Sequence, residues 1–147
     1  MAYSMRKRNF LFAFVIAASY CSAESVVVED NSPAVQGSLL NENVGIETLG
    51  GVLTPILNSG CKIPCRLTQV FSTAEDNQDQ ITIYLARGQQ KMASQSTRLG
   101  RYRISGIAPA PRGTPQIEVE FAVINGQILL SARDIEKISE IKLEKLK

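Results

Sequence analysis

Residues 69–83, which read QVFSTAEDNQDQITI, decide the fold of this chain. Apolar residues alternate with polar ones on both sides of the centre, at Phe71 before it and at Ile81 and Ile83 after it, as is typical of half-buried strands. Between them, residues 76–79 are poor strand formers and good turn formers. The stretch therefore predicts a β-hairpin with an apolar face beside a polar tip.

Runs of strand length recur along the rest of the chain and are separated by turn signals. They occupy residues 44–48, 52–57, 67–73, 81–86, 102–105, 117–124 and 128–132. In residues 117–124 apolar side chains alternate with Glu118, Glu120 and Ala122, which predicts one buried and one mostly solvated face. Seven short strands at this spacing favour an all-β sandwich or barrel.

The two flanks of this region are less regular. Residues 24–43 mix a valine run with acidic residues, proline and glycine and show no sustained period, so we expect a flexible lead-in there. In residues 135–146, Ile135, Ile138 and Ile141 recur every third position, as on a helix. Ile141 and Leu143 also alternate with charged residues, as on a strand, so the pattern alone leaves both structures open.

The first residues are typical of a secretory signal. Basic residues at positions 6–8 precede an apolar run at 10–18 and small residues at 21–23, which predicts a signal peptide over residues 1–23 with cleavage after Ala23. An uncleaved membrane anchor would need about 20 apolar residues, and this run is shorter. A lipid attached to Cys21 would need a small residue before it, where Tyr20 stands. We expect an exported protein, periplasmic or secreted, with no stable membrane insertion after cleavage.

Composition narrows the chemistry of the remaining chain. The 147 residues are 44% hydrophobic, which suits one globular domain, and carry a formal charge of +2 that falls to about −1 without the predicted signal. A near-neutral protein has no field to gather nucleic acid, so we expect no nucleic-acid partner.

Residues that could carry chemistry are few. The absence of histidine removes the usual nucleophile–base pairs and the common zinc sites, so we expect no enzyme activity, no metal and no cofactor. Glu118 and Glu120 could be a general acid and base, but two residues apart on a strand they share its solvent face. A basic patch at Arg98, Arg101 and Arg103 is better explained as a solvated face. No glycine-rich stretch has the spacing of a phosphate loop.

Two cysteines, Cys61 and Cys65, remain after the predicted cleavage. In an oxidising compartment they could form a disulfide, because three intervening residues including Pro64 allow a small closed loop if the backbone bends. An extended segment would hold them too far apart, so the sequence leaves pairing open. Two thiols alone do not complete a tetrahedral metal site.

Several motifs resemble one family closely. They read GIETLGG, QVFSTAEDNQ, ITI, LG, GIAPAPRGTPQIEVEF and ILLSARD, in this order, from residue 45 to residue 134. From about Val44 to the end, the chain resembles the substrate-binding β-domain of the heat shock protein 70 (DnaK-type) chaperones. The resemblance implies a domain over residues 44–147 that is a sandwich of two antiparallel four-stranded sheets, with loops at one end that hold an extended peptide. It also implies that residues 138–144 form the eighth strand.

The resemblance assigns the site residue by residue. The predicted pocket for one aliphatic side chain of a bound peptide is lined by Ile46, Thr48, Phe71, Ile81, Ile83 and Ile117. Leu49 and Ala74 are predicted to form an arch across the peptide backbone. Such a site would take extended or unfolded polypeptides, since main-chain hydrogen bonds suit any sequence and the pocket selects aliphatic residues.

The departures from the family shape the functional hypothesis. These 147 residues show no motif of the family's ATPase domain or helical lid, and Asp76 and Arg112 stand where the family latches that lid. We therefore expect ATP-independent, chaperone-like holding of extended polypeptides, without a nucleotide partner. The alternatives are an exported interaction or effector protein that binds one specific protein partner through the same fold, or a gene remnant that folds poorly.

Overall fold

The computed structural model describes residues 24–28, 35–136 and 140–147. The strands are β1 (Glu24–Val27), β2 (Val35–Gln36), β3 (Leu39–Leu40), β4 (Asn43–Thr48), β5 (Val52–Leu57), β6 (Cys65–Phe71), β7 (Gln80–Gly88), β8 (Thr97–Ser105), β9 (Ile117–Ile124), β10 (Gln127–Asp134) and β11 (Lys142–Leu146). A short 3-10 segment, η2 (Ala93–Gln95), precedes β8. The predicted signal at residues 1–23 lies outside the described residues.

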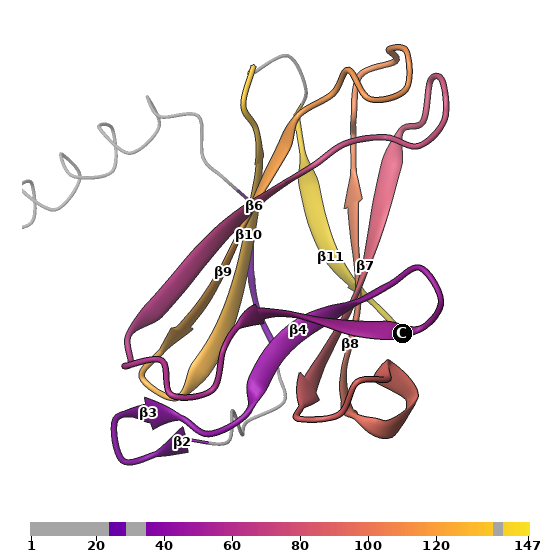
Figure 1. Ribbon diagram of the computed structural model, residues 1–147. Coiled ribbons are helices and arrows are strands. Elements are labelled where there is room, and N and C mark those ends of the chain that lie inside the picture. Colours follow the sequence, from indigo (N-terminus) through magenta and orange to yellow (C-terminus); the bar gives the residue numbers. More distant parts are fainter. Residues whose placement is uncertain (1–23, 29–34, 137–139) are drawn as a thin grey trace, which may run out of the picture.

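Two antiparallel sheets face each other (Figure 1). One has four strands in the order β1-β10-β9-β6, and the other has five in the order β11-β8-β7-β4-β5. The hairpin β2–β3 stands apart as a small third sheet. The predicted two-sheet antiparallel sandwich is confirmed, and the seven runs found in the sequence are β4 to β10. The second sheet has five strands rather than four, because β11 joins it and β1 completes the first sheet.

Alternation in the strands builds the core. Ile117, Val119, Phe121 and Val123 on β9 are fully buried. On the outer face of the same strand, Glu118 and Glu120 form ion pairs with arginines of the neighbouring strands. Strand β8 repeats the pattern, with Tyr102 and Ile104 fully buried between outward arginines. Each such apolar side chain contributes about 1.5–3 kcal/mol by burial, and both sheets contribute to one continuous cluster.

The C-terminal segment is a strand. β11 pairs with β8 from Lys142↔Ser105 to Leu146↔Arg101, and Leu143 is buried in the core. The pattern of alternation therefore prevails over the pattern of every third residue, and the strand begins after the expected residue 138, which lies outside the described residues. Gly106 makes the close approach possible, because a Cβ there would lie 2.2 Å from the carbonyl oxygen of Glu140.

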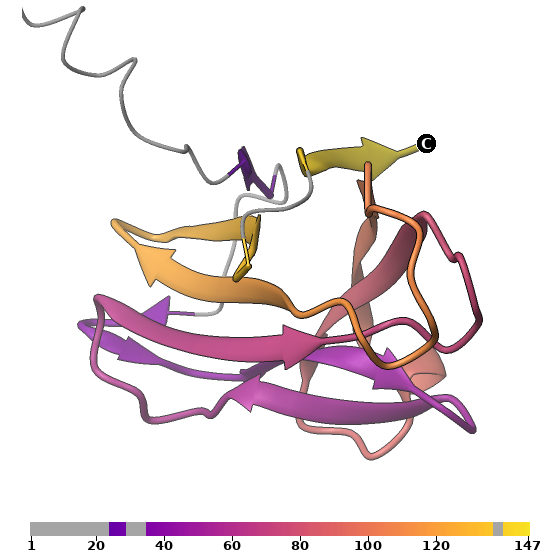
Figure 2. The same cartoon turned by 90° about the horizontal axis from the view of Figure 1, so that it is seen from above.

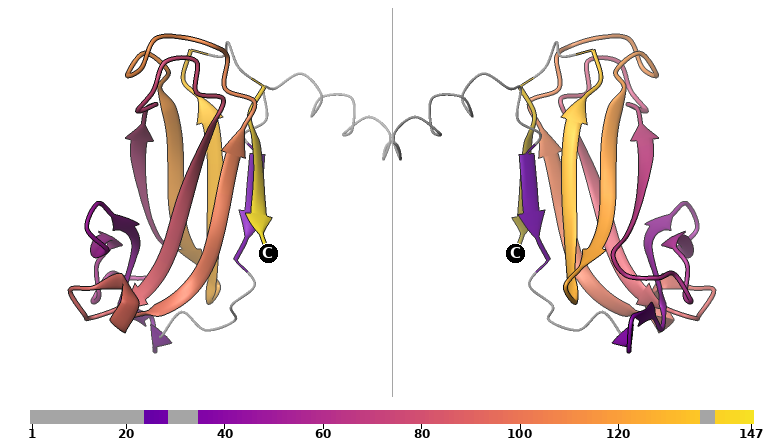
Figure 3. Two further views of the ribbon diagram at one scale, coloured as in Figure 1. Left: turned by 90° about the vertical axis from the view of Figure 1, so that its right-hand side faces the viewer. Right: turned by 90° about the vertical axis from the view of Figure 1, so that its left-hand side faces the viewer.

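The expectation of a flexible lead-in over residues 24–43 is wrong for the part of it that the structure describes. β1 pairs with β10 from Glu24↔Ala132 to Val27↔Leu129, and it lies beside β11 (Figure 3). Val28 and Leu40 are buried in the main core. The physical reason is that β10 offers an edge that needs a partner strand, and the valine run supplies one.

Candidate functional site

The β6–β7 loop (residues 72–79) is fastened to the segment that joins β8 to β9. The backbone N–H of Gly113 donates to the carbonyl oxygen of Thr73 at 3.0 Å, and that of Arg112 donates to the carboxylate of Asp76 at 2.9 Å. Figures 1 and 2 show the two segments side by side at one end of the sandwich. The β-hairpin predicted for residues 69–83 is wrong, because β6 pairs with β9 in one sheet and β7 pairs with β4 and β8 in the other. The polar stretch is a loop that connects the two sheets, and the proline-rich motif that follows β8 holds it in place.

The same loop is also braced from within by Gln78. Its side-chain oxygen accepts from the backbone N–H groups of Ala74 at 2.9 Å and Glu75 at 3.2 Å, and its Nε2 donates to the carbonyl oxygen of Gln80 at 2.6 Å. One side chain therefore fixes the main chain on both sides of the turn. Ala74, an exposed residue assigned to the arch, has its backbone N–H already engaged.

The β4–β5 turn (residues 49–51) lies across the gap from that loop and is built differently. It closes with a hydrogen bond from the N–H of Gly51 to the carbonyl oxygen of Thr48 at 3.0 Å, and Gly50 and Gly51 have φ of 85° and 74°. These values lie in the left-handed region, which favours glycine. Leu49 therefore sits at the corner of a tight turn, where it is 100% exposed.

Strands β4 and β7 separate between these two loops. They pair only from Asn43↔Gly88 to Ile46↔Leu85, after which β4 turns away towards β5 (Figure 1). Residues 80–84 of β7 and 47–48 of β4 therefore have no partner strand across the gap. Backbone groups along such an opening can hydrogen-bond to an additional extended chain.

Apolar side chains form the floor under this opening. Ile46, Ile83 and Ile117 are buried in the main core cluster, and Phe71 and Ile81 are half-buried against it. The structure thus brings together five of the eight residues assigned by resemblance. Their role in binding stays a prediction.

Three of the assigned residues lie at the rim instead. Thr48, Leu49 and Ala74 are exposed. The hydroxyl of Thr48 is 2.8 Å from that of Thr54, which braces the end of β4 against β5. Because Leu49 is fully exposed, its side chain does not touch Ala74, and the arch stays a prediction.

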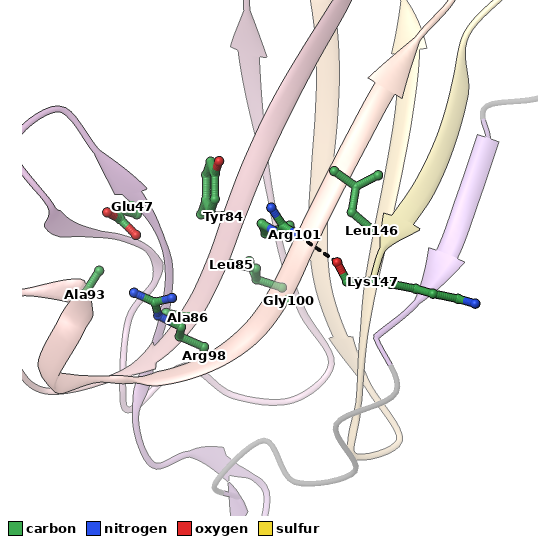
Figure 4. A pocket seen from close by; sticks show the side chains of 10 residues that line it. All are labelled: Glu47, Tyr84, Leu85, Ala86, Ala93, Arg98, Gly100, Arg101, Leu146 and Lys147. Carbon is green, nitrogen blue, oxygen red and sulfur yellow. Dashed lines mark hydrogen bonds between the residues drawn. The ribbon is translucent and has the colours of Figure 1, made fainter.

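Two hollows on the outer face of the five-stranded sheet were not foreseen from the sequence. The first, with a volume of about 240 Å³, has a floor that includes Ala86, Ala93 and Gly100 and a rim that includes Glu47, Tyr84, Arg98 and Arg101 (Figure 4). The second, with a volume of about 560 Å³, is lined by residues 74–80 and Thr82. The first hollow draws residues from five elements, so no local sequence pattern marks it.

Cys61 and Cys65 lie at the start of β6, away from these loops. Cys65 is buried in the core and Cys61 is half-buried against it. Burial alone does not decide whether the two thiols form a disulfide. Pairing therefore stays a prediction.

The outward glutamates of β9 are each held by an arginine of a neighbouring strand. Glu118 accepts from Nε of Arg133 at 2.6 Å, and Glu120 accepts from Arg66 at 3.3 Å. Among the residues that the structure describes, no group of histidine, cysteine, aspartate or glutamate is arranged to hold a metal ion. Within the same residues, no helix is long and apolar enough to cross a membrane.

Fold, loops and motifs together define an all-β domain of the chaperone peptide-binding type. The family model described as Hsp70 protein matches residues 28–145, and the chain belongs to the heat shock protein 70 family. It is 49% identical over 98 residues to a protein named Chaperone protein DnaK from Mycoplasmopsis pulmonis (strain UAB CTIP). That match covers 66% of this chain and 16% of the relative, so the chain spans about one sixth of that relative's length.

Proposed function

We propose that this domain binds extended or unfolded polypeptide segments in the gap between the β4–β5 turn and the β6–β7 loop, as a holding module that needs no ATP. The observation that carries the proposal is the separation of β4 from β7 directly above an apolar floor. An extended chain placed there would find backbone partners along residues 80–84 and an aliphatic environment at Ile46 and Ile81.

The binding chemistry favours breadth over strict sequence selection. Main-chain hydrogen bonds are available to any polypeptide, whereas the apolar floor rewards one aliphatic side chain. The rim adds Leu49 on one side and the braced main chain of Ala74 on the other. A module of this kind retains unfolded chains through a feature that most of them share, an exposed leucine-like residue.

ATP independence is part of the proposal. The 147 residues contain no glycine-rich stretch with the spacing of a phosphate loop. Peptide release would follow from movement of the exposed β4–β5 turn alone. We infer affinity on the order of micromolar with fast exchange.

Export is the second part of the proposal. Basic residues, an apolar run and small residues follow one another over residues 1–23, and this order supports a cleaved signal. N-terminal sequencing of protein from fractionated cells tests this. We expect a mature chain that begins at Glu24, outside the cytoplasm, and an intact Met1 in the cytoplasmic fraction contradicts it.

Fluorescence anisotropy with a labelled, leucine-containing peptide tests the binding proposal on the chain from Glu24. We expect saturable binding that is lost when the leucine is replaced by serine, and we expect ATP to change neither the affinity nor the dissociation rate. A cooperatively folded protein that binds neither peptide, or both equally, would sink the proposal and favour a specific folded partner. A nucleotide-dependent dissociation rate would remove ATP independence alone.

A further inference from the structure

The two hollows on the outer face of the five-stranded sheet carry opposite charge. We define the basic hollow as the cavity of about 240 Å³ rimmed by Arg98 and Arg101, and the acidic hollow as the cavity of about 560 Å³ lined by Glu75 and Asp79. Among the residues that the structure describes, Glu75, Asp79 and Arg98 form no ion pair, whereas the guanidinium of Arg101 is bound to a backbone oxygen of Lys147. Arg103, on the same strand as the two arginines, does pair with Glu144.

The basic hollow is shaped to accept a side chain. Its floor is made of small residues, with Ala86 and Ala93 buried and Gly100 beside them, which gives the cavity depth. The guanidinium of Arg101 donates to a backbone carboxylate oxygen of Lys147 at 2.6 Å, which holds it at the rim and leaves Arg98 as the arginine without an ion-pair partner among the described residues. Glu47 adds a negative side chain beside the two arginines, and Lys147 adds a positive side chain together with the backbone oxygen that Arg101 contacts (Figure 4).

Strand β7 connects the two hollows. Its outward residue Thr82 lines the acidic hollow and its outward residue Tyr84 lines the basic one. Two residues along a strand span about 7 Å. A single extended peptide of a few residues is therefore long enough to reach both hollows while it lies in the gap beside residues 80–84.

We propose that the basic hollow binds an acidic side chain that flanks the apolar residue of a bound peptide. The charges of the site would then orient the extended chain. The acidic flank of the peptide would lie at Arg98 and Arg101, and its basic flank at Glu75 and Asp79. The proposal rests on the proposed function and adds a selectivity to it. Charge complementarity of this kind fixes register and orientation more than raw affinity.

Two peptides of identical composition test the orientation. Both contain the same leucine core and blocked ends, one with glutamates before the core and lysines after it, the other with the two flanks exchanged. Both have the same length and no net charge, so a site without polarity binds them equally. We expect one order to bind about threefold to tenfold more tightly at low salt, and the difference to shrink as salt screens it.

Substitutions assign the difference to the hollow. The double change Arg98→Ala with Arg101→Ala should remove most of the preference, whereas Arg66→Ala, an exposed arginine on the other sheet, should leave it intact. A third peptide with serine flanks should bind the parent and the double variant equally, which shows that the groove is undamaged.

The possible failures are distinct. The inference is overturned if the parent binds both charge orders equally, or if the preference survives in the double variant. In either case, binding of the serine-flanked peptide by the parent still supports the proposed function. A folded parent that fails to bind the serine-flanked peptide overturns the proposed function and this inference with it.

Discussion

The β4–β5 turn and the β6–β7 loop face the same gap, but only the β6–β7 loop is held at its tip. Gln78 and the backbone N–H groups of Gly113 and Arg112 hold the β6–β7 loop from both sides. The β4–β5 turn is closed by one hydrogen bond and is tied at its base, where the carbonyl oxygen of Gly51 accepts from the N–H of Ala93 at 2.9 Å, but its corner residue Leu49 is fully exposed. In a site with one rigid and one free wall, the rigid wall sets the position of a bound chain and the free wall controls its entry and release.

The apolar floor beneath the β4–β5 turn and the β6–β7 loop is where a substitution should have the largest effect on peptide binding. Ile81→Phe adds a ring to the apolar floor, and we expect peptide affinity to fall at least about tenfold, which corresponds to 1.4 kcal/mol. Overpacking costs about 1–3 kcal/mol of stability, so cooperative unfolding must be shown first. Anisotropy titration measures the affinity.

Val123→Ala is the matched control for that change. Val123 is fully buried on β9 and is not part of the assigned pocket. The variant should lose about 1–2 kcal/mol of stability and retain its affinity. A folded Ile81→Phe protein that binds like the parent would show that the peptide site lies elsewhere.

The rigid wall is tested next, by Gln78→Ala. The change removes the acceptor of two backbone N–H groups, so we expect about 1 kcal/mol of lost stability and about fivefold weaker peptide binding, since ordering the loop becomes part of the cost of binding. Gln80→Ala is the control, because only the backbone oxygen of Gln80 takes part in the network. Equal effects of the two changes would contradict a preformed wall.

The free wall should respond through kinetics. Leu49→Ala trims a side chain that contributes nothing to the folded core, so stability should change by less than about 0.5 kcal/mol. We expect peptide dissociation to become about threefold faster, because a smaller side chain covers less of the bound chain. Stopped-flow displacement measures this rate. A large loss of stability would mean that the turn is packed in solution.

The smallest effect on affinity should come from the cysteines. A disulfide between Cys61 and Cys65 would stabilise the fold by about 2 kcal/mol, and its reduction should lower the melting temperature without changing peptide affinity. The reason is distance, since β6 places about 20 Å between its start and the β6–β7 loop. Thiol titration of the unreduced protein decides the matter, and two reactive thiols would end the idea of a bond.

The sequence predicted those strands that a short-range alternation of apolar and polar residues is enough to identify. The apolar positions of Ile117, Val119 and Phe121 are enough to place β9 and its buried face. β1 was not predicted from the sequence for two reasons. Its partner β10 is far away in the sequence, and a run of three valines among polar residues has neither the periodicity of a strand nor that of a helix. The pattern after residue 134 fitted a helix and a strand equally, and only the open edge of β8 decides between them.

The candidate site also has a part that the sequence predicted and a part that it did not. Residues 69–83 and the motifs around them located the loops and five apolar residues of the floor, since these belong to long, specific motifs. The basic hollow was not predicted from the sequence, because Arg98 and Arg101 were interpreted as part of a solvated face. Their arrangement with Glu47 and Ala93 depends on elements that meet only in the folded chain.

The pairing of β1 with β10 also sets the order of events when the chain is made. Glu24 and Ala132 are separated by roughly a hundred residues, and contacts of such long range form slowly because the intervening chain must first be brought together. β1 therefore waits for β10 before its sheet is complete. Until then the valines of β1 remain unpaired, and under the proposed export the chain would cross the membrane in that interval, before its fold is complete.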